Sequence, residues 1–311
     1  MSVLTLPARP GQESAPAPVP WQRMLWVTWR QHRTMLIGIT SVLAAAAVFL
    51  LIAGLKVRHD YAGLVHCDFA TVTYPSACAT KISHFNNNDW TLGNTCLIFM
   101  NFAPALIGAF TGPAVFAREL ETGTFRYAWT QGIGRVRWTI AKLTLLGLVL
   151  TALAWAFSQL YSWFFNPFLT TEDMNVLAAT VFDTRGIDFA AWVLVAFMIG
   201  AFLGMLIRRI IPAMAATLGA YLGVMLLAWL VLREDYPVAI DTTNGKLLNS
   251  GPAGPGSPWI LKSWTVGHTT WWRYIPVSRF WPMQFFEAGW LLVLAIALGG
   301  ATLWLVRRRA A

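Results

Sequence analysis

The sequence predicts an all-α integral membrane protein with six transmembrane helices, and two observations lead to this fold class. Of the 311 residues, 57% are hydrophobic and only 12% are charged, whereas a soluble domain carries about 25% charged residues. Six apolar runs are each long enough to cross the roughly 30 Å hydrocarbon core of a bilayer as a helix. We therefore expect a multi-pass protein of the cell membrane.

The N-terminal region divides into a tail and a surface helix. Residues 1–20 are rich in proline and small polar residues, which predicts a disordered tail. Residues 21–34 have helical periodicity, and the two faces differ in character: Trp21, Met24, Leu25, Thr28 and Trp29 on one, Arg23, Arg30 and Arg33 on the other. This pattern favours an amphipathic helix lying at the membrane surface. The alternative is that the segment is only the basic flank of the first span.

The transmembrane domain is expected over residues 35–311. Its spans are predicted at about residues 35–55, 95–116, 139–164, 189–207, 211–232 and 283–306. With the N-terminus inside, the cytoplasmic segments carry 14 of the 23 Lys and Arg residues but only three of the 14 acidic residues. Because short cytoplasmic loops carry an excess of Lys and Arg, both termini are predicted to be cytoplasmic.

The first outer loop contains Cys67 and Cys78 on the oxidising side of the membrane. A disulfide between them is expected in that compartment. The alternative is two free thiols in a polar loop, because the sequence does not fix the distance between the two Cα atoms.

An aromatic cluster precedes the last span. It consists of Trp271, Trp272, Tyr274, Phe280 and Trp281, which are residue types enriched at membrane interfaces. We expect a short re-entrant helix here that dips into the outer leaflet and contributes to an outer gate. A loop lying on the membrane surface is the alternative.

Motifs for catalysis, cofactors and metals are absent from the sequence. It contains no P-loop, GxGxxG, HExxH or GxSxG pattern, so no catalytic, cofactor-binding or metal-binding residue is predicted. The three cysteines form no CxxC pair. The net charge of +9 lies at span ends and follows from membrane orientation, so nucleic acid is not an expected partner.

The predicted spans contain almost no ionisable side chain. Only Lys142, near the cytoplasmic start of span 3, and Glu287, near the outer end of span 6, are charged. Ion-coupled carriers generally place ionisable groups at mid-membrane. If this chain moves a solute uphill, the energy must therefore come from elsewhere.

Small residues and prolines mark three of the spans. Gly200 with Gly204, and Gly219 with Gly223, have the GxxxG spacing of packed helices, so we interpret both pairs as packing contacts. In span 2, two prolines nine residues apart in sequence, Pro104 and Pro113, free backbone carbonyls. That pattern favours a cavity or a moving joint.

Two segments resemble a known family. Pro104–Lys142 contains P-x-x-x-G-x-F-x-G-P, then A-R-E-L-E-T-G-T, W-T-Q and R-V-R-W. Near the C-terminus, Y-I-P-V-S-R-F-W-P-M-Q-F-F-E precedes a span that ends in three arginines. These segments, with the six-span layout, resemble the permease subunits of type II ABC exporters.

The resemblance implies a division of roles. The permease would provide the pathway and work as a homo- or heterodimer in membrane lipid, while separate ABC ATPase subunits would bind ATP and Mg. The loop between spans 2 and 3 would dock on the ATPase through Arg118, Glu119, Glu121, Gly123, Thr124, Arg126 and Gln131. Gly123 suits a helix end, because glycine accepts the left-handed conformation. The alternative is a loop that rests on lipid headgroups.

The sequence thus favours a non-enzymatic permease that exports an amphipathic or lipid-like compound or a drug. The competing class is a membrane protein that transports nothing, such as an assembly factor or a sensory partner.

Overall fold

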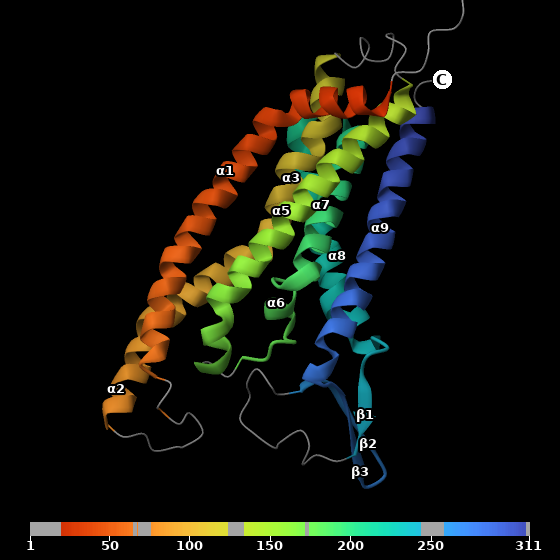
Figure 1. Cartoon of the computed structure of the whole chain (residues 1–311). Coiled ribbons are helices and arrows are strands. Elements are labelled where there is room, and N and C mark those ends of the chain that lie inside the picture. Colours follow the sequence, from red (N-terminus) through yellow and green to blue (C-terminus); the bar gives the residue numbers. More distant parts are fainter. Residues whose placement is uncertain are drawn as a thin grey trace, which may run out of the picture.

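The structure, a computed structural model, describes residues 20–64, 67, 76–123, 134–171, 174–243 and 258–308. Its long helices are α1 (Trp21–Ala62), α3 (Trp90–Thr122), α5 (Arg135–Thr171), α7 (Gly186–Ile207), α8 (Ile210–Leu230) and α9 (Phe280–Arg308). Figure 1 shows them as one elongated bundle. Within the described residues, six helices are long and apolar enough to cross a membrane. The predicted class, an all-α protein with six such helices, is confirmed.

The two ends of the bundle differ. The start of α1 and the end of α9 lie at the same end (Figure 1), which we call the terminal end. The short elements lie toward the opposite, sheet end: α2 (Ser76–His84), a π-helix (Phe85–Asp89), α6 (Ala179–Phe182), and two 3-10 helices (Leu232–Asp235 and Val277–Arg279). The single sheet of the described chain projects beyond the helices there.

The sheet has three antiparallel strands, β1 (Ile240–Thr242), β2 (Trp259–Val266) and β3 (Thr269–Ile275), in the order β1-β3-β2. The register pairs Trp264 with Trp271 across β2 and β3, and the two rings stack with centroids 6.5 Å apart. Gly267, in the turn between these strands, has a φ of 62°, which glycine adopts without steric cost.

The prediction of a re-entrant helix before the last span is therefore wrong. Trp271, Trp272 and Tyr274 lie on β3, whereas Phe280 and Trp281 are the first residues of α9. The physical reason is that Thr, Trp, Tyr, Val and Ile favour strands, and a two-residue turn containing glycine suits a hairpin. Aromatic composition alone does not distinguish a hairpin from an interfacial helix.

Helix α1 changes direction along its length. Its first part lies across the terminal end of the bundle, and the remainder descends beside α5 (Figure 1). In the first part the buried positions are Met24, Thr28, His32 and Leu36, which have the i, i+4 spacing of one helix face. The ring of Trp21 lies 4.8 Å below the guanidinium of Arg137 at the start of α5. Of the expected apolar face, Met24 and Thr28 are buried, whereas Trp21 and Trp29 are about half exposed at 44% and 46%. The position of this segment at a membrane surface stays a prediction.

Helices α3 and α7 pack with their backbones almost in contact. A Cβ atom added to Gly112 would lie 2.6 Å from the Cα of Gly200, and one added to Gly204 would lie 2.8 Å from the Cα of Pro113. Pro104 and Pro113 are both buried. Gly200 and Gly204 thus serve helix packing, as predicted. Gly108, Gly112 and Pro113 of span 2 lie at the same contact. A cavity or a moving joint in this span stays a prediction.

The glycine pair of α8 behaves differently. A Cβ added to Gly219 or Gly223 would meet no atom within 4 Å. The interpretation of these two glycines as packing contacts within the chain is therefore wrong, because α8 turns them away from the other described helices.

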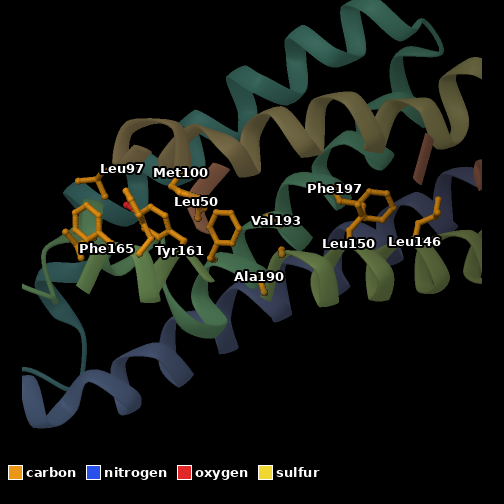
Figure 2. Packing of buried hydrophobic residues seen from close by; sticks show 14 of the residues in the cluster. Leu50, Leu97, Met100, Leu146, Leu150, Tyr161, Phe165, Ala190, Val193 and Phe197 are labelled. Atoms are coloured by element: carbon orange, nitrogen blue, oxygen red, sulfur yellow. The ribbon is translucent and has the colours of Figure 1, made fainter. Parts of the chain in front are cut away.

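The core runs along the centre of the bundle. Figure 2 shows its buried side chains, which come from α1, α3, α5 and α7, with Tyr161 and Phe165 of α5 close together. Their rings stack with centroids 5.4 Å apart. A second cluster joins α7, α8 and α9 around the fully buried Trp192. The bundle therefore has two packed layers that share α7.

Candidate functional site

The loop between α3 and α5 was the predicted coupling segment, and the structure describes both of its ends. Arg118, Glu119 and Glu121 lie on the last turns of α3, and α5 begins at Arg135. Thr124, Arg126 and Gln131 lie outside the described residues. Their roles stay predictions.

Gly123 ends α3 with a φ of 72° and a ψ of 3°. This is the left-handed conformation expected from a glycine at this place, since it carries no side chain to clash with the preceding carbonyl. The chain leaves α3 at the terminal end of the bundle, where α1 begins and α9 ends.

An ion pair joins α3 to α5 directly below this loop. Lys142 of α5 donates to Oε1 of Glu119, and the two side chains are 0% and 18% exposed. The ammonium also lies 3.9 Å from the ring centroid of Trp138, and that ring contacts Phe116 at 5.9 Å between centroids. Aromatic packing thus shields the pair from water. A charge so enclosed is tolerated because its partner is present.

A second acidic side chain of α3 reaches another helix. Oε2 of Glu121 accepts a hydrogen bond of 3.3 Å from the backbone amide of Ile210, the first residue of α8. A carboxylate at a helix N-terminus satisfies a free amide and interacts favourably with the helix dipole. The end of α3 is therefore connected to α5 through Glu119 and to α8 through Glu121.

The terminal end is basic. Exposed or half-exposed arginines come from the ends of all six long helices on this side: Arg23, Arg30, Arg33, Arg118, Arg135, Arg137, Arg208, Arg209, Arg307 and Arg308. Arg208 adopts a φ of 62° where α7 ends, and its amide donates to the carbonyl of Gly204. The described coupling residues Arg118, Glu119 and Glu121 thus lie at a basic end of the bundle.

The sheet end holds a buried ionic cluster that the sequence analysis missed. It consists of Asp183, Asp188, Arg233 and Glu287, which are exposed by 7%, 0%, 1% and 0%. Asp183 precedes α7, Asp188 lies in its first turn, Arg233 follows α8, and Glu287 lies on α9. Three separate chain segments, at the ends of α7, α8 and α9, therefore meet at one charged centre.

Arg233 holds two of the three carboxylates. Its Nη2 donates to Oε1 of Glu287 at 2.5 Å and also to Asp183, and its Nε donates to Oε2 of Glu287 at 3.1 Å. The indole of Trp229 donates to Asp183 at 2.5 Å, and the hydroxyl of Tyr236 donates to Glu287 at 3.1 Å. These two carboxylates are consequently well supplied with donors.

The carboxylate of Asp188, in contrast, has no donor. Among the described residues, neither of its oxygens has a hydrogen-bond partner. The nearby indole of Trp192 acts on it electrostatically without meeting hydrogen-bond geometry. Only the backbone amide of Asp188 is bound, at 3.1 Å, by Oε1 of Gln284. A fully buried carboxylate without a donor is unusual and needs an explanation.

No local signal in the sequence marks this cluster. The sequence places Asp183, Asp188 and Arg233 in the predicted outer loops. No two of the cluster residues have the spacing of a metal motif. The fold brings one oxygen from each of the three carboxylates within 4.8 Å of the others. They are the described residues that could hold a metal ion.

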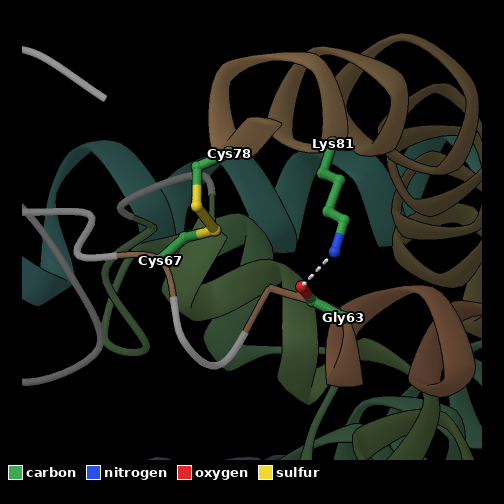
Figure 3. The surroundings of a disulfide bond; sticks show 4 residues. All are labelled: Gly63, Cys67, Cys78 and Lys81. Carbon is green, nitrogen blue, oxygen red and sulfur yellow. Dashed lines mark hydrogen bonds between the residues drawn. A yellow bond between two sulfur atoms is a disulfide. The ribbon is translucent and has the colours of Figure 1, made fainter. Parts of the chain in front are cut away.

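The disulfide expected in the first outer loop is present. Figure 3 shows Cys67 bonded to Cys78, with Cα atoms 5.8 Å apart. Close by, the ammonium of Lys81 on α2 donates to the carbonyl of Gly63, just past the end of α1, at 3.4 Å. The bond therefore connects the sheet end of α1 to α2.

The predicted outer-gate aromatics fall into two groups. Trp271 stacks on Trp264 within the hairpin. Phe280 contacts both Trp281 and Phe182, each at 5.5 Å between ring centroids. Trp272 and Tyr274 take their places in the β1-β3-β2 register. A role for these residues in gating stays a prediction.

An apolar groove opens between α1, α3 and α5. Its volume is about 370 Å³, and its lining includes Val42, Leu50, Phe99, Met100, Phe157 and Tyr161. The hydroxyl of Tyr161 is buried and has no hydrogen-bond partner among the described residues. The groove could accept an apolar chain.

The fold and its charge distribution define a multi-pass membrane protein. A family model described as ABC-2 membrane transporter related matches residues 40–233, which is more than half of the chain. The chain belongs to this family, and the resemblance to an ABC-2 type permease is thereby confirmed. No curated protein and no solved structure matches it.

Proposed function

We propose that this chain is the permease subunit of an ATP-driven exporter, coupled to a separate ATPase through the loop between α3 and α5. The ATPase would bind ATP and Mg, and a second permease copy would complete the pathway. The exported compound would be amphipathic or lipid-like. Membership of a family of ABC transporter membrane components supports the transport role.

The observation that carries the coupling role is the double connection at the end of α3. A force applied to the loop would reach α5 through Glu119 and Lys142, and α8 through Glu121 and Ile210. Rigid elements connected by such contacts can carry energetic coupling between distant sites. A loop that merely rested on headgroups would have no need of both connections.

Two further observations support the orientation and the substrate class. The arginines of the terminal end fit a cytoplasmic location, since basic residues are retained on that side of a cell membrane. The groove lined by Phe99, Met100 and Phe157 exposes almost entirely apolar atoms. Such a surface suits an acyl chain or another apolar part of a substrate.

The test is co-purification with the ATPase subunit from the same source. In Glu121→Lys and Arg126→Glu, we expect the amount of ATPase retained by the permease to fall at least about tenfold, which corresponds to about 1.4 kcal/mol of binding. Asp235→Lys and Lys81→Glu reverse charges at the sheet end and serve as matched controls. They should retain the ATPase.

Two results would overturn the proposal. If both loop variants are folded and still retain the ATPase fully, the loop is not the docking site. If the purified chain alone hydrolyses ATP, the division of roles between two subunits is wrong.

A further inference from the structure

The cluster at the sheet end has more negative charge than its arginine can balance. Asp183, Asp188 and Glu287 carry three negative charges when ionised, against one positive charge on Arg233, and all four side chains are nearly or fully buried. Burying a charge without a compensating partner is strongly unfavourable. One divalent cation beside the arginine would make the cluster neutral.

The hydrogen bonds show where the compensation is missing. Asp183 and Glu287 each accept bonds from Arg233 and from one aromatic side chain. Asp188 is fully buried, and both of its carboxylate oxygens lack a partner in the described chain. Its backbone is nevertheless held in place by Gln284. The side chain is positioned, and neither Trp192 nor Arg233, which both lie near it, forms a hydrogen bond with its carboxylate.

The three carboxylates lie close enough to share one ion, since an oxygen from each lies within 4.8 Å of the others. Calcium accepts flexible coordination geometry, whereas magnesium requires a near-ideal octahedron and usually keeps several waters. A buried cluster of this kind therefore suits calcium better. Three oxygen ligands also favour a hard cation over zinc or copper.

A cavity lies beside the cluster. It has a volume of about 380 Å³ and is lined by Val231, Leu232, Asp235, Tyr236, Phe286 and Trp290. Tyr236 lines this cavity, and its hydroxyl donates to Glu287 of the cluster. Asp235, which also lines the cavity, has a side chain that is 85% exposed. A cation drawn into the cavity by Asp235 would therefore have the Tyr236 side chain between it and the cluster.

We propose that Asp183, Asp188 and Glu287 form a binding site for one calcium ion at the sheet end of the bundle. The ion supplies Asp188 with its missing partner and connects the segment before α7 to α9. Because Arg233 follows α8 and already binds Asp183 and Glu287, the occupied site holds the ends of α7, α8 and α9 together. The inference does not depend on the coupling role proposed above.

The test uses the purified full-length chain in detergent, stripped of divalent ions with a chelator. Calcium should raise its thermal unfolding temperature by several degrees, in proportion to the logarithm of the calcium concentration above the dissociation constant. Magnesium at the same concentration should raise it less. Asp188→Asn should bind calcium at least about tenfold more weakly, since even residues that only orient metal ligands contribute about that much.

A spectroscopic measurement tests the position of the ion. Terbium, a luminescent substitute for calcium, is sensitised by nearby indoles, and Trp229 donates directly to Asp183. Terbium luminescence should be displaced by calcium in the natural chain and should be strongly reduced in Asp188→Asn. Asp241→Asn removes an exposed carboxylate of the hairpin and should leave the signal unchanged.

Equilibrium dialysis tests the site without any variant. It should find about one calcium ion bound per natural chain. The proposal is overturned if the natural chain binds no calcium and its unfolding temperature is insensitive to it. That outcome would mean that protons, not a metal ion, neutralise the cluster. It is also overturned if calcium binds equally well to a folded Asp188→Asn chain.

Discussion

Glu119 and Glu121 are two residues apart on α3, yet they bind two different helices. Glu119 accepts from the buried ammonium of Lys142 on α5, and Glu121 accepts from the backbone amide of Ile210 on α8. The last turns of α3 are thus bonded to both α5 and α8.

The ion pair between Glu119 and Lys142 should be important for stability. Lys142→Met keeps the length of the side chain but leaves Glu119 without its partner. We expect the free energy of unfolding to fall by about 3 kcal/mol, since breaking a buried pair leaves an uncompensated charge. Thermal unfolding of the purified chain measures the loss.

The double variant Lys142→Met with Glu119→Gln separates charge from packing. It should recover much of the lost stability, because no charge is then left buried. Lys81→Met is the matched control, since Lys81 is exposed and donates only to a carbonyl at 3.4 Å. Equal destabilisation by Lys142→Met and Lys81→Met would contradict the prediction.

The contact between α3 and α7 should not accept even one added methyl group. In Gly112→Ala the new Cβ would lie 2.6 Å from the Cα of Gly200, so the helices must separate. Overpacking of this kind costs about 1–3 kcal/mol, and the unfolding temperature should fall. In Gly223→Ala nothing lies within 4 Å of the new atom, and alanine stabilises a helix relative to glycine by about 0.5–1 kcal/mol.

These two glycine variants should therefore change stability in opposite directions when both are measured on a monomeric chain in detergent. A loss of stability in Gly223→Ala would show instead that another molecule packs on that face of α8. A neutral Gly112→Ala would mean that α3 and α7 are less closely packed than the structure indicates.

The bond between Cys67 and Cys78 should stabilise the sheet end of α1. It closes a loop with a sequence separation of 11 residues, and in the chain-entropy view such a loop contributes about 3 kcal/mol. The unfolding temperature should fall in Cys67→Ser and on addition of a reductant. Cys96→Ala removes the free cysteine of α3 and should leave the response to the reductant intact. An unfolding temperature that does not change when the reductant is added would contradict this prediction.

The sequence was sufficient to predict features that depend on neighbouring residues. Each of the six apolar runs lies in a long helix because hydrophobic length is a local property, and Gly123 ends α3 because of its own conformational freedom. The hairpin was missed, since the alternation around Trp271 is weak and aromatic residues suit a membrane interface equally well.

The buried cluster could not be predicted for a different reason. Arg233 and Glu287 are 54 residues apart, the first just after α8 and the second inside the predicted last span. Their meeting depends on how α7, α8 and α9 pack, which a hydropathy pattern does not specify. Similarly, nothing in the GxxxG spacing distinguishes Gly200, where an added Cβ would clash with α3, from Gly223, where an added Cβ would meet no described atom within 4 Å.

The hairpin at the sheet end should loosen in acid. Arg273 of β3 donates to both oxygens of Asp241 on β1, at 2.8 and 3.1 Å, and this hydrogen bonding lowers the pKa of Asp241 below its usual 3.8. A carboxyl group whose pKa is lower in the folded chain stabilises the fold above its unfolded pKa. The contribution is lost as the pH falls through the lower, folded pKa.

Hydrogen exchange of the β2–β3 segment measures the effect. After correction for the intrinsic dependence of exchange on pH, protection in residues 259–275 should be constant from pH 7 to about pH 5 and should then fall below pH 4. In Asp241→Asn the protection should be lower at every pH and should no longer fall in acid. Only part of the protection should be lost, because Arg273 also lies 3.4 Å from Asp235 and that ion pair remains. An acid step of the same size in Asp241→Asn would show that another group, and not this ion pair, controls the strand pairing.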